Sequence, residues 1–267
     1  MKNMNRFTRY VLAVCATMIL LIVAAYAIFR YKTRAELQPK QLESVSSKTK
    51  KSKTESERQQ IKIACIGDSI TYGAGVRRTR KRDAYPAKLA ALLGDDYTVL
   101  NYGISGKTLL NETDTPYRKM DFFQESQDIQ PDIVLIMLGT NDSKAFNWNA
   151  GEYEKQLEEF VNIYKNLPGS PQVYLMTCCA AFSTNKEDIV AFHVDKSVIA
   201  NEVTPIIKRV AEKCEVPLID IYAVTKGHPE FFADGVHPNA RGNEMIAQTV
   251  YEALKAETSG AEAKSAR

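Results

Sequence analysis

The sequence contains few of the residues and spacings that metal and cofactor sites require. It has three histidines among its 267 residues, and its five cysteines show no metal-ligand spacing. It also lacks a glycine-rich phosphate loop, because Gly73-Ala74-Gly75 falls short of a dinucleotide fingerprint. These absences predict a protein that needs neither a metal ion nor an organic cofactor. They also leave only His193, His228 and His237 as candidates for a histidine base.

Residues 61–267 lack an excess of positive charge. They carry 23 Lys and Arg against 28 Asp and Glu, a balance of −5, whereas residues 1–60 carry 12 against 4, a balance of +8. The net charge of +3 is therefore the sum of two unlike parts. A domain with a negative balance does not have the electrostatic footprint of nucleic-acid binding, so nucleic acid is not an expected partner.

The first 60 residues do not read as part of a globular domain. After a short tail, residues 1–10, the run 11–29 is uncharged and apolar and has the length needed to cross a bilayer as a helix. Residues 30–60 are rich in Lys, Ser, Gln and Glu, which predicts a disordered basic tether. A cleaved signal peptide is the rival interpretation of the apolar run, because Ala25-Tyr26-Ala27 is similar to a cleavage site.

These features predict a single-pass membrane protein, anchored by its N-terminal helix, whose globular domain lies outside the cytoplasm. Secretion after cleavage is the alternative. Basic residues flank the apolar run on both sides, so the positive-inside rule does not decide the orientation. The sequence does not indicate the oligomeric state.

Beyond Gln60, short apolar runs alternate with amphipathic helical patterns such as Glu152–Leu167 and Arg241–Ala256. Such alternation predicts an α/β fold: a three-layer, flavodoxin-like, doubly wound sheet of five parallel strands in the order 2-1-3-4-5. The domain is expected to span residues 61–257, followed by a flexible C-terminal tail at 258–267. The expected strands are Ile61–Ile66, Tyr97–Asn101, Asp132–Leu138, Gln172–Thr177 and Pro217–Ile221.

Residues that suit acyl-transfer chemistry follow these strands. Ser69 comes after the first strand, and Asp234 and His237 come after the fifth. Ligands of such sheets bind beyond the carboxyl ends of the strands, which is where these side chains are expected. A serine hydroxyl becomes a good nucleophile when an imidazole takes its proton and a carboxylate orients that imidazole. Asp220, at the end of the fifth strand, stays open as an alternative acid.

Four segments follow the predicted strands: Gly67-Asp68-Ser69-Ile70-Thr71, Asn101-Tyr102-Gly103-Ile104-Ser105-Gly106, Gly139-Thr140-Asn141-Asp142, and Asp234 with His237. Together they resemble the SGNH, or GDSL, hydrolase family over residues 61 to about 255. The resemblance implies the SGNH hydrolase fold and ester hydrolysis by Ser69, His237 and Asp234. It also implies an oxyanion hole built from the N–H of Ser69, the N–H of Gly103 and the side-chain amide of Asn141.

Residues next to Ser69 and Asn141 also bear on the architecture of the site. The G-x-S-x-G elbow of the α/β-hydrolases requires a glycine where this sequence has Thr71, so that architecture is not expected. Asp68 and Asp142 are expected to hold turns through backbone hydrogen bonds.

The sequence says less about the substrate. The same segments are similar to the sialate O-acetylesterase and acetylxylan esterase branch, which implies removal of acetyl groups from a small-molecule or glycan ester. Trp148 and Tyr117 are candidates for stacking on a sugar ring, with core packing as the other interpretation. A lysophospholipase or thioesterase is an alternative that a long apolar groove beside Ser69 would favour. A non-catalytic, tethered glycan-binding domain is a further one.

Overall fold

The computed structural model describes residues 60–265, with side chains for residues 60–257. The predicted membrane span at 11–29 lies outside the described residues, as does the predicted tether apart from Gln60. Among residues 60–265, no helix combines the length and the apolar character needed to cross a bilayer.

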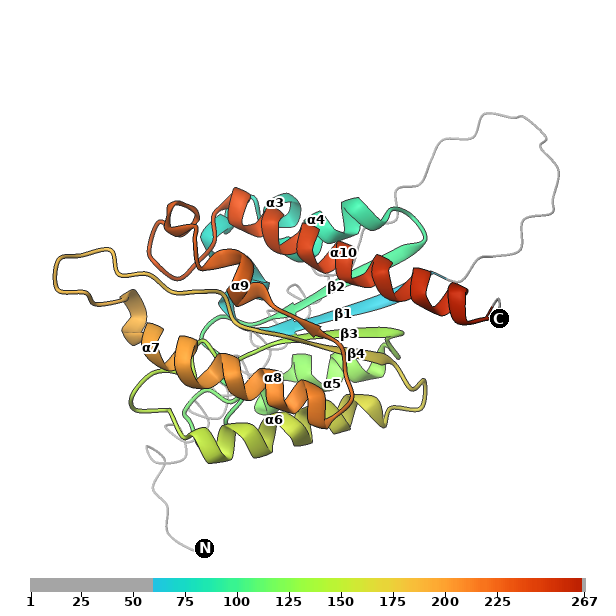
Figure 1. Ribbon diagram of the computed structural model, residues 1–267, viewed down its shortest axis with the longest axis horizontal. Coiled ribbons are helices and arrows are strands. Elements are labelled where there is room, and N and C mark those ends of the chain that lie inside the picture. Colours follow the sequence, from blue (N-terminus) through green and yellow to red (C-terminus); the bar gives the residue numbers. More distant parts are fainter. Residues whose placement is uncertain (1–59, 266–267) are drawn as a thin grey trace, which may run out of the picture. The chain divides into compact units, whose positions relative to one another are not determined.

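Five parallel strands form one sheet in the order β2-β1-β3-β4-β5, which confirms the predicted topology (Figure 1). β1 is paired on both sides, by β2 and by β3, and its residues after Lys62 are buried. A strand buried on both faces reads as a continuous apolar run, which is why these runs could be located in the sequence. The strands are β1 (Ile61–Gly67), β2 (Tyr97–Gly103), β3 (Ile133–Met137), β4 (Gln172–Met176) and β5 (Leu218–Ile219).

Helices cover both faces of the sheet (Figure 1). One layer holds α5 (Asp121–Asp128), α6 (Ala150–Lys165) and α8 (Thr204–Lys213), and α7 (Lys196–Val198) precedes α8. The other holds α4 (Tyr85–Leu93) and α10 (Ala240–Ser265), with α3 (Arg80–Asp83) and α9 (Ile221–Thr225) beside them. The short helix α2 (Ser69–Tyr72) follows β1 directly.

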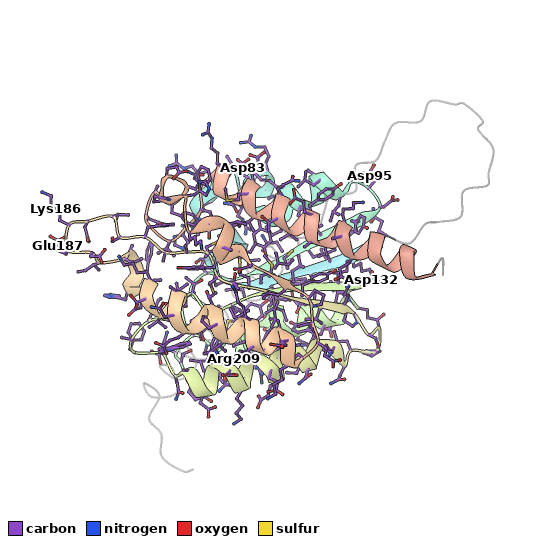
Figure 2. All side chains as sticks on the ribbon, in the orientation of Figure 1. Asp83, Asp95, Asp132, Lys186, Glu187 and Arg209 are labelled. Atoms are coloured by element: carbon purple, nitrogen blue, oxygen red, sulfur yellow. The ribbon has the colours of Figure 1, made fainter. Side chains whose placement is uncertain are left out.

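The pleat of the strands divides the core into two apolar layers. In β1, Ala64 and Ile66 pack with residues of α6 and α8, whereas Ile63 and Cys65 pack with residues of α4 and α10. Side chains fill the space on both sides of the sheet (Figure 2). Alternate residues of one strand thus hold the two helical layers, and the sheet becomes a rigid base for the loops at its carboxyl edge.

Several element boundaries differ from the predictions, among them the ends of β5 and α10. β5 ends at Ile219, because the side chain of Asp220 accepts a hydrogen bond from Ala223 N–H at 3.1 Å and caps α9. α10 continues to Ser265, into the segment 258–267 that was predicted to be a tail. The residues after Ala256 include Glu, Ala and Lys, which favour helix, and no proline stops it.

Candidate active site

Ser69 lies at the carboxyl end of β1, where the strand turns into α2. The side chain of Asp68 accepts a hydrogen bond from Ile70 N–H at 2.9 Å and so caps this short helix. The cap confirms the predicted turn-holding role of Asp68. It fixes the backbone on both sides of Ser69, which is 7% exposed. The nucleophile candidate therefore sits on an ordered turn at the edge of the sheet.

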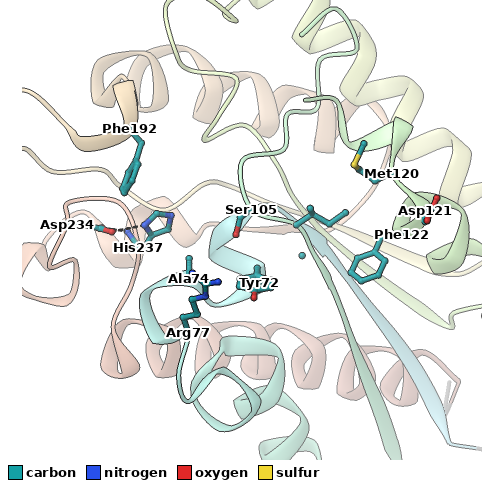
Figure 3. A pocket seen from close by; sticks show the side chains of 12 residues that line it. Tyr72, Ala74, Arg77, Ser105, Met120, Asp121, Phe122, Phe192, Asp234 and His237 are labelled. Atoms are coloured by element: carbon teal, nitrogen blue, oxygen red, sulfur yellow. Dashed lines mark hydrogen bonds and ion pairs between the residues drawn. The ribbon is translucent and has the colours of Figure 1, made fainter. Parts of the chain in front are cut away.

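His237 and Asp234 reach Ser69 from a single loop that follows β5. His237 Nε2 lies 2.9 Å from Ser69 Oγ, and His237 Nδ1 lies 2.7 Å from Asp234 Oδ2 (Figure 3). The other carboxylate oxygen, Oδ1, accepts the backbone N–H of Val236 at 3.0 Å and of His237 at 2.7 Å. The backbone thus fixes the carboxylate, the carboxylate orients the ring, and the ring faces the hydroxyl.

The electrostatics of the loop keep Asp234 ionised. Partial burial by itself would raise the pKa of this carboxyl, but the hydrogen bonds from His237 and Val236 outweigh it and lower the pKa below its ordinary value. A carboxylate that remains charged holds the proton of the neighbouring imidazole on Nδ1 and leaves Nε2 free to accept the proton of the serine.

The alternative acid, Asp220, is engaged elsewhere. Its side chain accepts from Thr177 Oγ1 at 3.0 Å, caps α9 and pairs with Lys208 at 2.5 Å. The other two histidines also lie apart from Ser69. His228 contacts Glu230 at 2.9 Å, and His193 is exposed beside Phe146. The structure thus brings together Ser69, Asp234 and His237 and none of the competing candidates.

Asn141 follows β3 and is 6% exposed. The side-chain amide of Asn141 donates to the backbone carbonyl of Lys107 at 3.1 Å. The backbone carbonyl of Asn141 accepts from Asn147 Nδ2 at 2.9 Å. An amide carries two N–H donors, so one remains for a ligand. Asn141 is thereby fixed against the loop that follows β2.

The geometry contradicts the predicted donor role of Gly103. The N–H of Gly103 already donates to Asn101 Oδ1 at 2.9 Å, so that proton is directed along β2 and away from a ligand. The glycine serves close packing instead, because a Cβ at this position would lie 2.1 Å from the backbone nitrogen of Tyr72. Asn101 also donates from Nδ2 to the carbonyl of Thr71 at 2.8 Å, and so ties β2 to the helix that carries Ser69.

Gly106 lies in the same loop, immediately before Lys107. Its φ of +78° is a conformation that glycine adopts without strain. A Cβ there would meet nothing within 4 Å, so packing does not require the glycine. Because Asn141 bonds to the next residue, the backbone at Gly106 lies beside the Asn141 amide.

Asp142, next to Asn141, holds that loop in place. Its carboxylate accepts the N–H groups of Leu110 at 2.8 Å and Leu109 at 3.1 Å, which confirms the predicted role in a turn. Complete burial raises the pKa of Asp142 to about 7, although these two hydrogen bonds lower it. Burial also raises the pKa of Asp68.

A pocket of about 780 Å³ opens beside the three residues (Figure 3). In Figure 3, His237 and Asp234 lie at one end and Met120, Asp121 and Phe122 at the other. The volume is typical of a small-molecule site. Its lining consists of Tyr72, Ala74, Arg77, Gly103, Ile104, Ser105, Met120, Asp121, Phe122, Phe192, Asp234 and His237.

The two predicted sugar-stacking residues do not line this pocket. Tyr117 is fully buried and donates its hydroxyl to the carbonyl of Tyr102 at 2.6 Å. Trp148 packs against Tyr153 with the ring centroids 5.2 Å apart, and its Nε1 donates to Glu202. Both residues therefore follow the core-packing interpretation.

Phe192 is one of the aromatic residues that line the pocket, together with Tyr72 and Phe122. Its ring centroid lies 5.1 Å from that of His237, and 53% of its surface is exposed. It has a φ of +61°, a conformation that non-glycine residues adopt infrequently. Nothing in the sequence around it signals either property.

A doubly wound parallel sheet that carries a serine, a histidine and an aspartate in hydrogen-bonded sequence at its carboxyl edge has the arrangement of the serine hydrolases. Residues 65–245 match the model of the GDSL-like Lipase/Acylhydrolase family. The chain belongs to this family.

Similar proteins agree with this assignment. The chain is 33% identical over 214 residues to the acetylxylan esterase of Xylanibacter ruminicola, covering 73% of this chain and 43% of that protein. It is 27% identical over 231 residues to the multidomain esterase of Ruminococcus flavefaciens, covering 73% of this chain and 28% of that protein. The chain thus spans less than half the length of these two relatives.

Solved structures show the same fold. A carbohydrate acetylesterase family member from Sinorhizobium meliloti matches with a TM-score of 0.59 at 21% identity, over 73% of this chain and 98% of that one. The aryl esterase of M. smegmatis matches with a TM-score of 0.60 at 21% identity, over 73% of this chain and 99% of that one.

Proposed function

We propose that the protein is a serine esterase that removes O-acetyl groups from carbohydrates. The observation that carries this proposal is the triad of side chains at the edge of a pocket, in which Ser69 is hydrogen-bonded to His237 and His237 to Asp234. The names of the similar proteins, an acetylxylan esterase and a carbohydrate acetylesterase, support acetylated sugars as the substrate class. The intact triad argues against a purely glycan-binding role, since binding does not require a triad.

The proposed mechanism has two halves. His237 Nε2 takes the proton of Ser69 Oγ as the oxygen attacks the ester carbonyl carbon, and the tetrahedral intermediate then expels the sugar alcohol, which receives that proton from His237. A water molecule, deprotonated by the same nitrogen, attacks the carbonyl carbon of the acyl-serine; the bond to Ser69 Oγ then breaks, His237 returns the proton to Oγ, and acetate is released. Asp234 stabilises the imidazolium in both halves without accepting its proton.

The negative oxygen of the intermediate requires donors close to Ser69. The N–H of Ser69 and the free amide hydrogen of Asn141 fulfil this requirement in the proposal. We assign the remaining donor to the N–H of Gly106, because the N–H of Gly103 is bound to Asn101 and Gly106 lies beside the Asn141 amide. Each such donor contributes roughly a hundred- to a thousandfold in rate.

The acyl-chain preference distinguishes this proposal from a lipid esterase. The apolar residues Ile104, Met120 and Phe122 line the pocket, and they favour the lipid alternative by offering a surface to a longer acyl chain. The decisive experiment measures hydrolysis of p-nitrophenyl esters from acetate to palmitate by the full chain, with Ser69→Ala as the control. Acetate release from acetylated xylo-oligosaccharides follows.

The expected result is a preference for acetyl, release of acetate from the oligosaccharide, and no hydrolysis by the Ser69→Ala variant. A maximum at long chains would replace the carbohydrate substrate with a lipid. Equal turnover by the wild type and the variant would exclude the serine mechanism.

For its location, we propose that residues 11–29 anchor the protein in a membrane and hold the domain outside the cytoplasm. Support comes from nineteen consecutive residues without charge, followed by a polar, basic stretch. Retention in the membrane fraction after alkaline extraction, together with digestion of the domain by protease added to intact cells, is the expected result. Recovery of a shortened, soluble protein from the medium would instead indicate cleavage and secretion.

A further inference from the structure

Five of the six residues from Arg77 to Arg82 are Lys or Arg, in a domain whose overall balance is −5. This basic segment begins at the pocket. Arg77 lines the pocket together with His237 and Asp234, and in the view of Figure 3 its side chain lies between His237 and Tyr72. A concentration of positive charge therefore begins at the pocket that His237 lines, in a domain whose overall balance is negative.

The cations of this segment have different environments. Arg82 pairs with Asp83 at 2.8 Å. The guanidinium of Arg80 lies 4.1 Å from the centre of the Tyr72 ring, which itself lines the pocket. Arg77 is exposed and forms no ion pair with any residue of the described part, 60–265. The pocket wall thus carries one guanidinium without a protein counter-ion.

The two acids of the pocket do not neutralise Arg77. Asp234 is engaged by His237 and by two backbone N–H groups. Asp121 lies at the opposite end of the pocket in Figure 3. A planar guanidinium offers two parallel N–H donors, which match the two oxygens of a carboxylate or a phosphate. A neutral glycan offers hydroxyl oxygens to these donors but no opposite charge, so its hydrogen bonds with Arg77 are weaker than those of an anion.

We infer that the substrate is an anionic glycan, in which Arg77 binds a carboxylate or phosphate group close to the acetylated hydroxyl. The inference rests on the proposed esterase function and specifies its substrate. Arg80 keeps Tyr72 against the pocket wall, and the remaining cations raise the local concentration of a polyanion. Arg77 is then a specificity-determining residue of the site.

The test compares three acetylated oligosaccharides of equal length: a neutral xylo-oligosaccharide, an oligogalacturonate and an oligo(glycosyl phosphate). The full chain is expected to show a higher kcat/KM on at least one anionic substrate than on the neutral one, and added salt is expected to reduce this preference. Arg77→Gln is expected to reduce the anionic-to-neutral ratio by about five- to tenfold. The anionic substrate whose kcat/KM falls relative to that of the neutral substrate identifies the group that Arg77 binds.

Arg78→Gln is the matched control. It removes the same charge from the next residue, which is exposed but does not line the pocket, and it is expected to keep the ratio within about twofold. Equal ratios in the wild type and Arg77→Gln would overturn the inference while ester hydrolysis itself stands. An equal fall of the anionic-to-neutral kcat/KM ratio in both variants, together with an equal fall in their binding to anionic lipid vesicles, would also overturn the inference. That result would assign the basic segment to a membrane surface. Absence of hydrolysis on every ester, p-nitrophenyl acetate included, would overturn the esterase proposal and this inference with it.

Discussion

His237 Nε2 lies 2.9 Å from Ser69 Oγ, although 168 residues separate the two along the chain. All neighbouring strands of the sheet are parallel, so the carboxyl end of β1 and the loop that precedes α10 lie at the same edge of the sheet. Asp234 completes the arrangement within three residues of the histidine. The nucleophile is thus fixed by the start of the domain, and the acid and base are fixed by its end.

Asp234→Asn is expected to lower kcat by about a thousand- to ten-thousandfold, because an amide cannot hold the Nδ1 proton as a carboxylate does and so favours the wrong tautomer of His237. Steady-state kinetics on p-nitrophenyl acetate provides the measurement. Asp220→Asn is the matched control, since Asp220 also follows β5 but contacts Lys208 and Thr177. A comparable loss in the control variant would show that the acid has been wrongly assigned.

Asn141→Ala is expected to lower kcat by about a hundred- to a thousandfold with little change in KM, because the amide acts on the oxygen that becomes negative in the transition state. The control is Asn149→Ala, which removes the N-cap of α6 and costs about 1 kcal/mol of stability without reaching the site. A rise in KM with an unchanged kcat would contradict the proposed role of Asn141.

Asn101→Asp is expected to reduce both stability and kcat. Aspartate can still accept the N–H of Gly103, but it cannot donate to the carbonyl of Thr71, which then faces a carboxylate. The loss is expected to be about 1–3 kcal/mol in the free energy of unfolding, measured by urea denaturation. Asn162→Asp, on the exposed side of α6, is the control. An unchanged urea midpoint in Asn101→Asp would show that Asn101 does not hold α2 against β2.

Asp142 makes the stability depend on pH in an unusual direction. Burial raises its pKa to about 7, whereas an aspartate in the unfolded chain has a pKa of about 4. Between these values the folded protein retains a proton that the unfolded chain has released, so the free energy of unfolding falls as the pH rises from about 4 to about 7. Asp68, whose pKa burial also raises, contributes in the same direction.

Asp142→Asn is therefore expected to flatten this pH dependence, leaving the part that Asp68 contributes. Urea midpoints at a series of pH values provide the measurement. Asn keeps one of the two acceptors that Leu109 and Leu110 use, so the variant is expected to fold. A variant whose midpoints follow those of the wild type at every pH would refute the assignment of this titration to Asp142.

The sheet and the position of the candidate catalytic residues could be predicted from the sequence, because both depend on local patterns. Strands buried on both faces form continuous apolar runs, and the carboxyl ends of parallel strands meet at one edge of the sheet, which is where Ser69 and His237 are expected. The choice of Asp234 over Asp220 comes from the resemblance to the SGNH hydrolases. The alternation of strands and helices predicts a parallel sheet, and five strands suit the order 2-1-3-4-5. These features depend on local patterns and on the fold class, both of which a single sequence contains.

The details that were missed depend on contacts between distant segments. The N–H of Gly103 is directed toward Asn101, and only the three-dimensional structure shows that this donor is occupied. Tyr117 was a candidate for stacking on a sugar ring, with core packing as the other interpretation, and it lies in the core, where its hydroxyl donates to the carbonyl of Tyr102. Phe192 faces His237 through a left-handed backbone conformation that no residue pattern announces.

Helix α10 is the last element of the domain, and it packs against α4, which lies near the start of the domain in the sequence. Ile246 and Val250 of α10 share one apolar layer with Leu89 of α4, and all three are fully buried. A growing chain that has not yet reached Ala240 leaves this apolar surface uncovered, however complete its strands are. The domain can therefore finish folding only after its synthesis is nearly complete, and its assembly is a late event in the life of the nascent chain.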